Sequence, residues 1–397
     1  MGILRSSRHA AGLLAAVLTI ACGGGGTTTG SKSTYLLAFI SDLTGPAASQ
    51  SHPFLNGFKT YLDWTNENGG VNGHPVQVTV NDDAYDVAKA KIAIQNAEAS
   101  GVLGVFGGAE PAVWGPNAVL APQTQMLQLT VGMTETFAVP PQPYLYLMST
   151  TSSQNGTGMI NLLQQVIKDG KAPDKPKVAI MRFASPGVQA TSAFMQQQFK
   201  TLGWSFVGEQ QYALTATDVS SQASTMVAAK PDAIFAPAID SQAPLVVKTL
   251  RQKGFTGPVI GFQGASQDGT FAAMNDAGYY AFRTFVLPGT AGVQGAIEES
   301  ERASRSGNTV NIGTAQFSQG YVMGQIAILA LQKCVDPCTR TAYNDAMNNL
   351  GKIDTKGLNP DIQITPSRHV VIGAVMPFKW DSSAKAAVAM GTWIQLS

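Results

Sequence analysis

The sequence predicts an α/β protein built from two doubly wound parallel sheets, and three observations support this. Short apolar segments alternate with segments of helical period from Tyr35 onward. The turns between them are only a few residues long, which is typical of parallel sheets whose strands are connected by helices. The alternation begins again after residues 148–151. We therefore expect two lobes of similar size.

The first run of alternating elements occupies residues 35–130. Residues 54–67 predict a helix, because Phe54, Phe58 and Leu62 fall on one helical face. The segment Tyr35–Ser41 before it is a short apolar strand, whereas Val76–Val80 after it alternates between apolar and polar residues like a strand. The expected strands are Tyr35–Ser41, Val76–Val80, Val102–Phe106 and Met126–Thr130, and the expected helices are Phe54–Glu67, Val87–Ala99 and one that begins at Pro111.

The second run occupies residues 156–262 and repeats the pattern. After Pro288, two helices at about 291–305 and 314–333 follow each other with no strand between them, and a strand-rich tail completes the chain. We therefore expect the chain to cross between the lobes more than once. The other expected elements are helices 156–168, 188–202, 219–230 and 241–253, and strands 177–181, 204–211, 233–236, 258–262, 370–375, 378–380 and 392–396.

The N-terminal residues have the composition of an export signal. Arg5 and Arg8 precede an apolar run at residues 10–20, which is too short to span a membrane. A small residue follows this run. We expect residues 1–21 to be a signal peptide that is removed on export.

A cysteine directly after this segment resembles the acylated cysteine of a bacterial lipobox. Cys22 follows the small residue Ala21, although Thr19 stands where a leucine is usual. Residues 22–34 are rich in glycine and threonine and predict a flexible tether. We expect Cys22 to be lipidated and to hold the exported protein on the bacterial cell membrane, facing the periplasm or the cell exterior. The alternative is an ordinary signal peptide with a chance cysteine.

Composition and charge exclude several classes of function. Charged residues make up 13% of the chain and hydrophobic residues 44%, which favours a folded protein over a disordered one. The formal net charge is +1, and it falls to −1 when Arg5 and Arg8 leave with the signal peptide. Without a basic stripe the chain has no means to hold a phosphate backbone, so we expect no nucleic-acid partner.

Two further cysteines lie close together, in the segment Cys334-Val-Asp-Pro-Cys338. Exported proteins form disulfides readily, so a local disulfide between them is the expectation. The alternative is a metal site, but two cysteines without nearby histidines supply only half of the usual ligands.

The common motifs of catalysis are missing from the sequence. The segment 264–268 resembles a nucleophile elbow but lacks its last glycine. The glycine-rich segment 104–108 does not have the spacing of a dinucleotide-binding turn. His52, His74 and His369 lie far apart, without the spacing of a zinc-binding helix. We therefore expect a binding protein rather than an enzyme, with no cofactor and no metal.

Several short motifs follow one another in a specific order over residues 35–397. They are Ser41–Ala47, Asn56–Gly57, Asn68–His74, Asn81–Asp83, Val105–Gly107, Leu129–Thr134, Leu250–Phe255 with Gly261, Thr339–Arg340 and Pro366–His369. Together they resemble the branched-chain amino-acid type of periplasmic binding protein, which is the solute receptor of an ABC importer. The resemblance implies two lobes that close on a small-molecule ligand, with ABC permease and ATPase subunits as partners.

The resemblance also implies a hinge made of three crossovers, which we place near Thr151, Pro288 and Ala374. Closure about such a hinge shifts an equilibrium between open and closed forms when the ligand binds. The expected lobes are then 35–151 with 289–374 (lobe 1) and 152–288 with 375–397 (lobe 2).

The implied binding site departs from the amino-acid pattern at two positions. Members that bind α-amino acids hold the carboxylate with a serine, where this chain has Pro111 after Glu110. Proline has neither an N–H nor a hydroxyl, and a glutamate beside it would repel a carboxylate. The same members hold the ammonium with an acidic residue, where this chain has the uncharged Gln263. We therefore expect a ligand other than a free α-amino acid: an acid bound differently, an amide or urea-like compound, or a polyol.

The remaining candidates come from the same comparison with the family pattern. Gln50 stands where the family has a pocket aromatic, and Ile239–Asp240 where it has a tyrosine, while the loop at Gly132 and Thr134 keeps the family chemistry. Each candidate has a purely structural alternative, such as a helix cap for Glu110 or core packing for Trp114. The candidate ligand-binding residues are Gln50, Glu110, Pro111, Trp114, Gly132, Met133, Thr134, Phe183, Ile239, Asp240 and Gln263.

We therefore expect a lipid-anchored solute-binding protein that delivers a small molecule to an ABC importer by closing around it. The alternative is a ligand-sensing module that reports to a membrane partner. An exported enzyme is disfavoured, because the motifs of catalysis are missing.

Overall fold

The computed structural model of the protein describes residues 32–132 and 135–396. The predicted signal peptide, Cys22 and most of the predicted tether lie outside these residues. None of the described helices combines the length and the apolar character that crossing a membrane requires.

The first sheet has five parallel strands connected by helices. Its elements are β1 (Tyr35–Ser41), α1 (Ala48–Glu67), β2 (Val76–Asp82), α2 (Val87–Ala99), β3 (Gly104–Gly107), α3 (Pro111–Asn117), α4 (Leu120–Thr124), β4 (Leu127–Thr130) and β5 (Leu145–Leu147). The strand order is β2-β1-β3-β4-β5. All neighbouring pairs are parallel, as the alternation of strand and helix predicts.

The second sheet is larger and mixed. Its elements are α5 (Ser152–Lys168), β6 (Lys177–Phe183), α6 (Pro186–Leu202), β7 (Ser205–Tyr212), α7 (Ser220–Ala228), β8 (Ala233–Phe235), α8 (Ala243–Gln252), β9 (Val259–Ile260), α9 (Asp268–Met274), β10 (Tyr279–Arg283), β13 (Ala374–Asp381), β14 (Ala386–Ala389) and β15 (Ile394–Gln395). The strand order is β14-β13-β10-β9-β8-β6-β7, and β15 also pairs with β13. The strands from β6 to β10 are parallel, whereas β13 is antiparallel to all of its neighbours.

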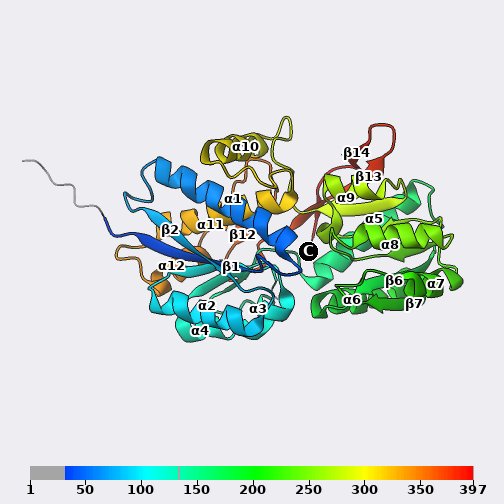
Figure 1. Cartoon of the computed structure of the whole chain (residues 1–397), viewed down its shortest axis with the longest axis horizontal. Coiled ribbons are helices and arrows are strands. Elements are labelled where there is room, and N and C mark those ends of the chain that lie inside the picture. Colours follow the sequence, from blue (N-terminus) through cyan, green and yellow to red (C-terminus); the bar gives the residue numbers. More distant parts are fainter. Residues whose placement is uncertain (1–31, 133–134, 397) are drawn as a thin grey trace, which may run out of the picture. The chain divides into compact units, whose positions relative to one another are not determined.

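The segment between β10 and β13 returns to the first sheet. It contains α10 (Gln294–Ser306), α11 (Ala315–Lys333), α12 (Arg340–Asn348), β11 (Gly351–Lys352) and β12 (Gln363–Ile364). Buried residues of these helices, such as Ile326 and Tyr343, share one core with Phe39 and Phe58 of the first sheet and its helix α1. Figure 1 shows α11 beside α1. The chain therefore passes between the two lobes three times. This confirms the predicted fold class, and the antiparallel β13, β14 and β15 are its only departure from parallel pairing among the described strands of the two large sheets.

Strand β1 illustrates why the first sheet reads as a continuous apolar run in the sequence. Leu37 and Phe39 belong to the core that α1 and α11 cover, whereas Ala38 and Ile40 belong to the core that α2 and α3 cover. All four side chains are fully buried. Successive residues of a strand point to opposite faces, so a strand covered on both faces needs apolar residues at every position.

Several elements differ from their predicted bounds. Helix α1 begins at Ala48 rather than Phe54. Pro53 lies inside the helix, which continues through it without the hydrogen bond that a proline cannot donate to the carbonyl of Ser49. The predicted strand 370–375 is mostly isolated bridges, and the continuous strand begins at Ala374. The elements α9, β10 and α12 were not predicted. The lobe boundaries at residues 151, 288 and 374 stay predictions.

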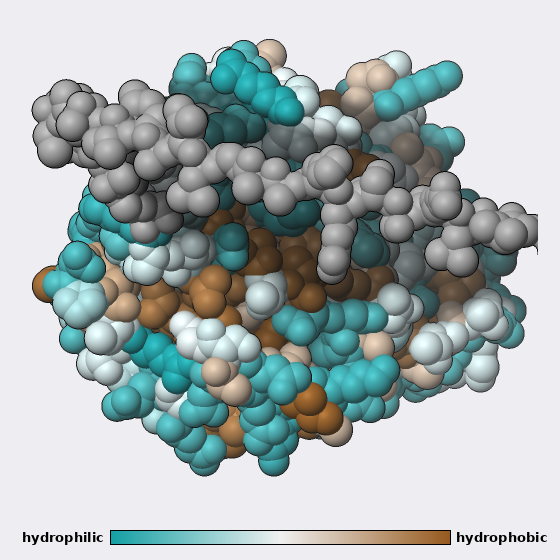
Figure 2. Space-filling model, turned by 60° about the vertical axis from the view of Figure 1, so that its left-hand side comes forward, coloured by the Kyte–Doolittle hydropathy of each residue, from teal (hydrophilic) through white to brown (hydrophobic). Residues whose placement is uncertain are grey.

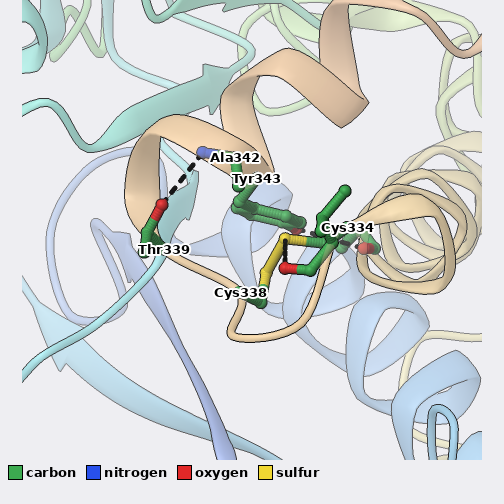
Figure 3. Close-up of a disulfide and its surroundings, with 7 residues drawn as sticks. Cys334, Cys338, Thr339, Ala342 and Tyr343 are labelled. Atoms are coloured by element: carbon green, nitrogen blue, oxygen red, sulfur yellow. Dashed lines mark hydrogen bonds between the residues drawn. A yellow bond between two sulfur atoms is a disulfide. The ribbon is translucent and has the colours of Figure 1, made fainter.

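Cys334 and Cys338 form the predicted disulfide directly after α11 (Figure 3). Their Cα atoms lie 5.5 Å apart, which is usual for a disulfide. The next residue, Thr339, caps α12, and its hydroxyl oxygen accepts a hydrogen bond from the N–H of Ala342 at 3.2 Å. The disulfide and the cap together fix the turn between α11 and α12.

Figure 2 shows one face of the protein, on which apolar residues gather in a recess that hydrophilic residues surround. Exposed large apolar side chains are scattered over several elements. Ile92 is on α2, Val310 is in the loop before α11, and Val335 is in the disulfide loop. Single exposed residues of this kind are normal on a folded protein.

Candidate functional site

A cavity of about 160 Å³ lies where the carboxyl ends of strands from both sheets meet. Its first-lobe lining follows β1, β2, β3, β4 and β5, and its second-lobe lining follows β6, β7, β8, β9 and β10. The first turn of α11 completes it. Ligands of open α/β sheets bind outside the carboxyl ends of the strands, because loops and helix starts converge there. This cavity is therefore the candidate site.

The described residues that line the cavity carry no charge. They are Ala47, Gln50, Phe54, Tyr85, Ala109, Pro111, Val131, Ser149, Thr150, Ser152, Asn155, Phe183, Ser185, Gly187, Val188, Thr191, Leu214, Ile239, Phe262, Gln263, Gly264, Ser266, Gln267, Thr284, Ala315, Gln316 and Gln319. Amides and hydroxyls supply the polar groups of this lining. Aromatic and aliphatic side chains supply the rest.

Some of the predicted site residues line this cavity and others do not. Those in the lining are Gln50, Pro111, Phe183, Ile239 and Gln263. Those outside it are Glu110, Trp114, Gly132 and Asp240. Met133 and Thr134 lie outside the described residues. The part that each residue plays in binding stays a prediction.

Gln263 joins the second lobe to the first crossover. Its Nε2 donates hydrogen bonds to Ser149 Oγ and Thr150 Oγ1, both at 2.9 Å. The Thr150 hydroxyl donates in turn to Asn155 Oδ1 at 2.7 Å. The amide N–H groups of Gln263 are therefore occupied within the protein, and its carbonyl oxygen remains for a ligand.

Glu110 is fully buried and does not cap α3. Its Oε1 accepts hydrogen bonds from Ser41 Oγ at 3.2 Å, from the Asp42 N–H at 3.1 Å and from Ser51 Oγ at 3.3 Å. Its Oε2 accepts one from Trp114 Nε1 at 3.2 Å. Burial raises the pKa of the Glu110 carboxyl. The side chain thus ties the end of β1 to α1 and α3, and Trp114 packs in the core beside it.

Two more carboxyl groups complete what we call the carboxylate cluster: Asp42, Asp83 and Glu110. Asp42 accepts hydrogen bonds from the N–H groups of Gly45 and Ala47 in the turn before α1. Asp83 accepts one from the N–H of Tyr85 at 3.0 Å, and its second oxygen has no partner among the described residues. Burial, with the charge of Glu110, raises the pKa of Asp83 to about 7. The cluster therefore holds the turns that place Ala47 and Tyr85 at the cavity.

Asp240 stands beside the lining on the second lobe. It accepts hydrogen bonds from Thr270 Oγ1 at 2.5 Å and from Gln316 Nε2 at 3.4 Å. Burial raises its pKa to about 6. Nearby, Gln267 Oε1 accepts the N–H of Ala315 at 2.8 Å, so the start of α11 is bonded to the second lobe.

Sequence reasoning missed the amides on α9 and α11. Gln267 directly precedes α9, and Gln316 and Gln319 are the second and fifth residues of α11. Residues three apart in a helix share a face, and a threonine suited to a helix cap, Thr314, comes directly before α11. These signals place two amides at a helix start, but only the fold shows that this start faces the cavity.

The described residues contain no group of three or more His, Cys, Asp or Glu side chains arranged to hold a metal ion. The polar groups of the cavity are hydrogen-bonding groups of neutral side chains. Such an arrangement can bind and orient a small molecule.

A sequence profile described as periplasmic binding protein matches residues 34–386 of the chain. A search of curated proteins found no sequence that matches. Among solved structures, the chain is similar to a fatty acid ABC transporter substrate-binding protein from Thermomonospora curvata, with 20% identity, a TM-score of 0.78 and coverage of 91% of this chain and 92% of that one.

The chain is also similar in structure to two proteins described as branched-chain amino-acid transporter proteins. One, from Thermus thermophilus with bound valine, is 17% identical, with a TM-score of 0.81 and coverage of 92% of this chain and 97% of that one. The other, LivJ from Streptococcus pneumoniae in complex with isoleucine, is 16% identical, with a TM-score of 0.76 and coverage of 90% and 99%. At these identities the similarity establishes the fold.

Proposed function

The chain belongs to the periplasmic binding protein family, as its motifs predicted, and we propose that it is the solute-binding component of an ABC importer. The observation that carries this proposal is the cavity at the carboxyl ends of both sheets, lined by both lobes. Membership of this family implies export, which agrees with the predicted signal peptide. The similar structures named above come from ABC transporters, which supports the same assignment.

Binding by closure follows from the connection between the lobes. Three crossovers link them, and a small rotation about such links changes the width of the cleft. A ligand that contacts both walls favours the closed form, because only that form makes all the contacts at once. The closed form then distinguishes a loaded receptor from an empty one for the permease.

The ligand that we propose is a small molecule other than a free α-amino acid. Pro111 lines the cavity and offers no N–H to a carboxylate. Gln263 lines the opposite side and offers no negative charge to an ammonium group. Glu110 supplies no such charge either, since it is buried in the carboxylate cluster.

A thermal-shift screen against a metabolite library tests the binding function, because a ligand at 100 times its Kd stabilises the folded protein by about 2.7 kcal/mol. The variant Gly187→Phe tells whether the cavity is the site. Gly187 is the second residue of α6 and lines the cavity, and a Cβ atom there meets no other atom within 4 Å. The fold therefore tolerates a side chain at this position, while the ring obstructs the cavity.

A matched control is available at the second residue of α9. Gly269 is exposed, is outside the cavity lining, and has equally free space for a Cβ atom. We expect compounds that stabilise the wild type to stabilise Gly269→Phe but not Gly187→Phe. Stabilisation of Gly187→Phe to the same extent would place the ligand elsewhere and refute the proposal.

We also propose that Cys22 anchors the protein to the membrane through a lipid. The replacement Cys22→Ser should release the exported protein from the membrane fraction, with the mass of an unlipidated chain. A Cys22→Ser variant that stays with the membranes would contradict the anchor.

The import and sensing alternatives predict different results when the gene is deleted. If the protein delivers its ligand to an importer, deletion of its gene should abolish uptake of that ligand, and the wild type should restore it but Gly187→Phe should not. Permease and ATPase genes beside this gene would agree with import. Unchanged uptake together with a neighbouring kinase or cyclase gene would identify the sensing alternative.

A further inference from the structure

The cavity lining narrows the chemical class of the ligand, an inference that rests on the proposed function. We propose that the ligand is an uncharged small molecule, with hydroxyl or carboxamide groups attached to an apolar body. Three features of the site support this inference. The lining offers no counter-charge to a charged ligand, three of its hydroxyl groups already donate hydrogen bonds within the protein, and three nearby helix starts have lost an N–H donor.

The first feature is that Arg283 and Asp240, the charged side chains beside the second-lobe lining, already have partners. A charged ligand in a closed cleft loses its hydration, and only a counter-charge or several hydrogen bonds offset that cost. Arg283, the buried cation behind Ser266, donates to the carbonyl of Ser266 at 2.6 Å and to Asp268 Oδ1 at 2.5 Å. Asp240 is hydrogen-bonded to Thr270 and Gln316. No described residue of the lining carries a charge that could serve as a counter-charge for the ligand.

The second feature is that three hydroxyl groups of the lining already donate their hydrogen atoms to backbone carbonyl groups. Ser152 Oγ and Thr191 Oγ1 both donate to the carbonyl of Gly187, each at 3.1 Å. Ser266 Oγ donates to the carbonyl of Gln263 at 3.1 Å. A carbonyl oxygen can only accept, so these hydroxyls can accept a hydrogen bond from the ligand but cannot donate one. These three positions therefore suit ligand N–H and O–H groups better than a carboxylate.

The third feature concerns the helix starts around the cavity, which are common sites for anions. The start of α3 has Pro111, which lacks an N–H. The start of α11 is bonded through the N–H of Ala315 to Gln267. At α5, Thr151 accepts the N–H of Gln154 at 3.1 Å. Each of these three starts therefore offers one N–H group fewer to an anion.

Helix α6 is different, and it supplies the donor that a neutral ligand needs. No described side chain caps it, and Gly187 and Val188 of its first turn line the cavity. One helix start can serve a carbonyl or hydroxyl oxygen of the ligand. An ionised carboxylate would need more, because its two oxygens offer about four acceptor sites.

Apolar side chains make up the remaining walls and favour a hydrocarbon part in the ligand. They come from both lobes and include Phe54, Val131, Phe183, Leu214, Ile239 and Phe262. Together with the acceptor wall and the start of α6, they describe a molecule with an apolar body and uncharged polar groups.

The test uses sets of compounds that share one carbon skeleton and differ in charge. One set is isovaleramide, isoamyl alcohol, isovalerate and isoamylamine, and a second is phenylacetamide, phenethyl alcohol, phenylacetate and phenethylamine. A library of ureas, lactams and polyols extends the uncharged group. Each compound is added at millimolar concentration to the wild type, Gly187→Phe and Gly269→Phe near neutral pH. We expect uncharged compounds alone to raise Tm by at least about 2 °C, in the wild type and Gly269→Phe only.

The outcomes separate this inference from the proposed function. If a carboxylate or an amine raises Tm in the wild type and Gly269→Phe but not in Gly187→Phe, the cavity binds a ligand and the inference about charge is wrong. If no uncharged compound raises Tm, the inference is also wrong. If Tm rises equally in Gly187→Phe, the cavity is not the site, and the proposed function fails with it.

Discussion

The cavity lining and the carboxylate cluster behind it are neighbours in the chain but opposites in charge. Pro111 lines the cavity, and Glu110, one residue earlier, is fully buried in the cluster. Tyr85 lines the cavity, and Asp83, two residues earlier, is buried in the same cluster. In this part of the protein, carboxylates hold the turns that shape the site, while uncharged groups face the ligand.

Burying carboxylates in the cluster lowers the stability of the folded protein. Glu110 and Asp83 lie close enough for each charge to oppose the other, and burial raises the pKa of both. The hydrogen bonds that they accept from the backbone and from hydroxyl groups offset part of that cost. A carboxylate in the cavity itself would lack those particular donors. The cluster can therefore contain carboxylates while the neighbouring lining contains none.

The largest effect is expected from removing the centre of the cluster. Glu110→Ala leaves the Asp42 N–H and the Trp114 indole N–H without their acceptor and creates a cavity. We expect a loss of about 2–4 kcal/mol in the free energy of unfolding, measured by urea denaturation. Glu301→Ala, at an exposed position on α10, is the control and should change stability by at most about 0.5 kcal/mol. A Glu110→Ala variant as stable as this control would show that the cluster does not hold the fold.

The next effect is expected from placing a charge in the lining. Gln263→Glu loses the two amide N–H donors that bind Ser149 and Thr150 and puts a carboxylate beside the ligand. The affinity for an uncharged ligand should fall about 10–100-fold, or about 1.4–2.8 kcal/mol, measured by calorimetry. Gln197→Glu, exposed on α6, should bind like the wild type. Equal affinities for the two variants would mean that the lining tolerates charge.

The smallest effect is expected from neutralising Asp83, and it depends on pH. The pKa of Asp83 is about 7 in the folded protein and 3.8 as a free side chain. The unfolded chain therefore releases this proton first, and the wild type loses stability as the pH rises from about 4 to about 7. Asp83→Asn removes that loss, so its stability relative to the wild type should rise between about pH 4 and about pH 8.

Denaturation midpoints at the two pH values measure this difference. Asp174→Asn, at an exposed position, is the control and should show no change with pH relative to the wild type. A gain for Asp83→Asn that is the same at both pH values would show that Asp83 does not titrate in this range.

The fold was largely predictable because several inner strands, such as β1, β3 and β4, are buried on both faces. The run from Tyr35 to Ser41 is apolar at nearly every position, and the structure places it between β2 and β3, inside the first sheet. The start of α1 was not predictable from the same pattern, because Pro53 reads as a helix boundary although the helix continues through it. Strand β10 was missed because a short buried strand has no polar alternation that distinguishes it from other apolar segments.

The site was predictable where a residue follows a strand and has a counterpart in the family pattern, as for Pro111 and Gln263. Glu110 was not separable from Pro111 by sequence, since neighbouring residues at a helix start can face the cavity or the core. Gln316 and Gln319 were missed because the second crossover of the chain brings α11 back to the first lobe. A contact of that kind depends on tertiary structure and leaves no local signal.

Calorimetric titration with leucine, isoleucine and valine tests most directly whether the lining excludes charged ligands. Each lacks a partner for its carboxylate at Pro111 and for its ammonium at Gln263, and each unmet hydrogen bond of a charged group costs about 1.5–3 kcal/mol. Two such losses weaken binding by roughly 10²–10⁴-fold, which takes a micromolar affinity to about millimolar or weaker. We predict no measurable heat of binding at micromolar protein concentration for any of the three. Micromolar binding of one of them, lost in Gly187→Phe and kept in Gly269→Phe, would contradict the account.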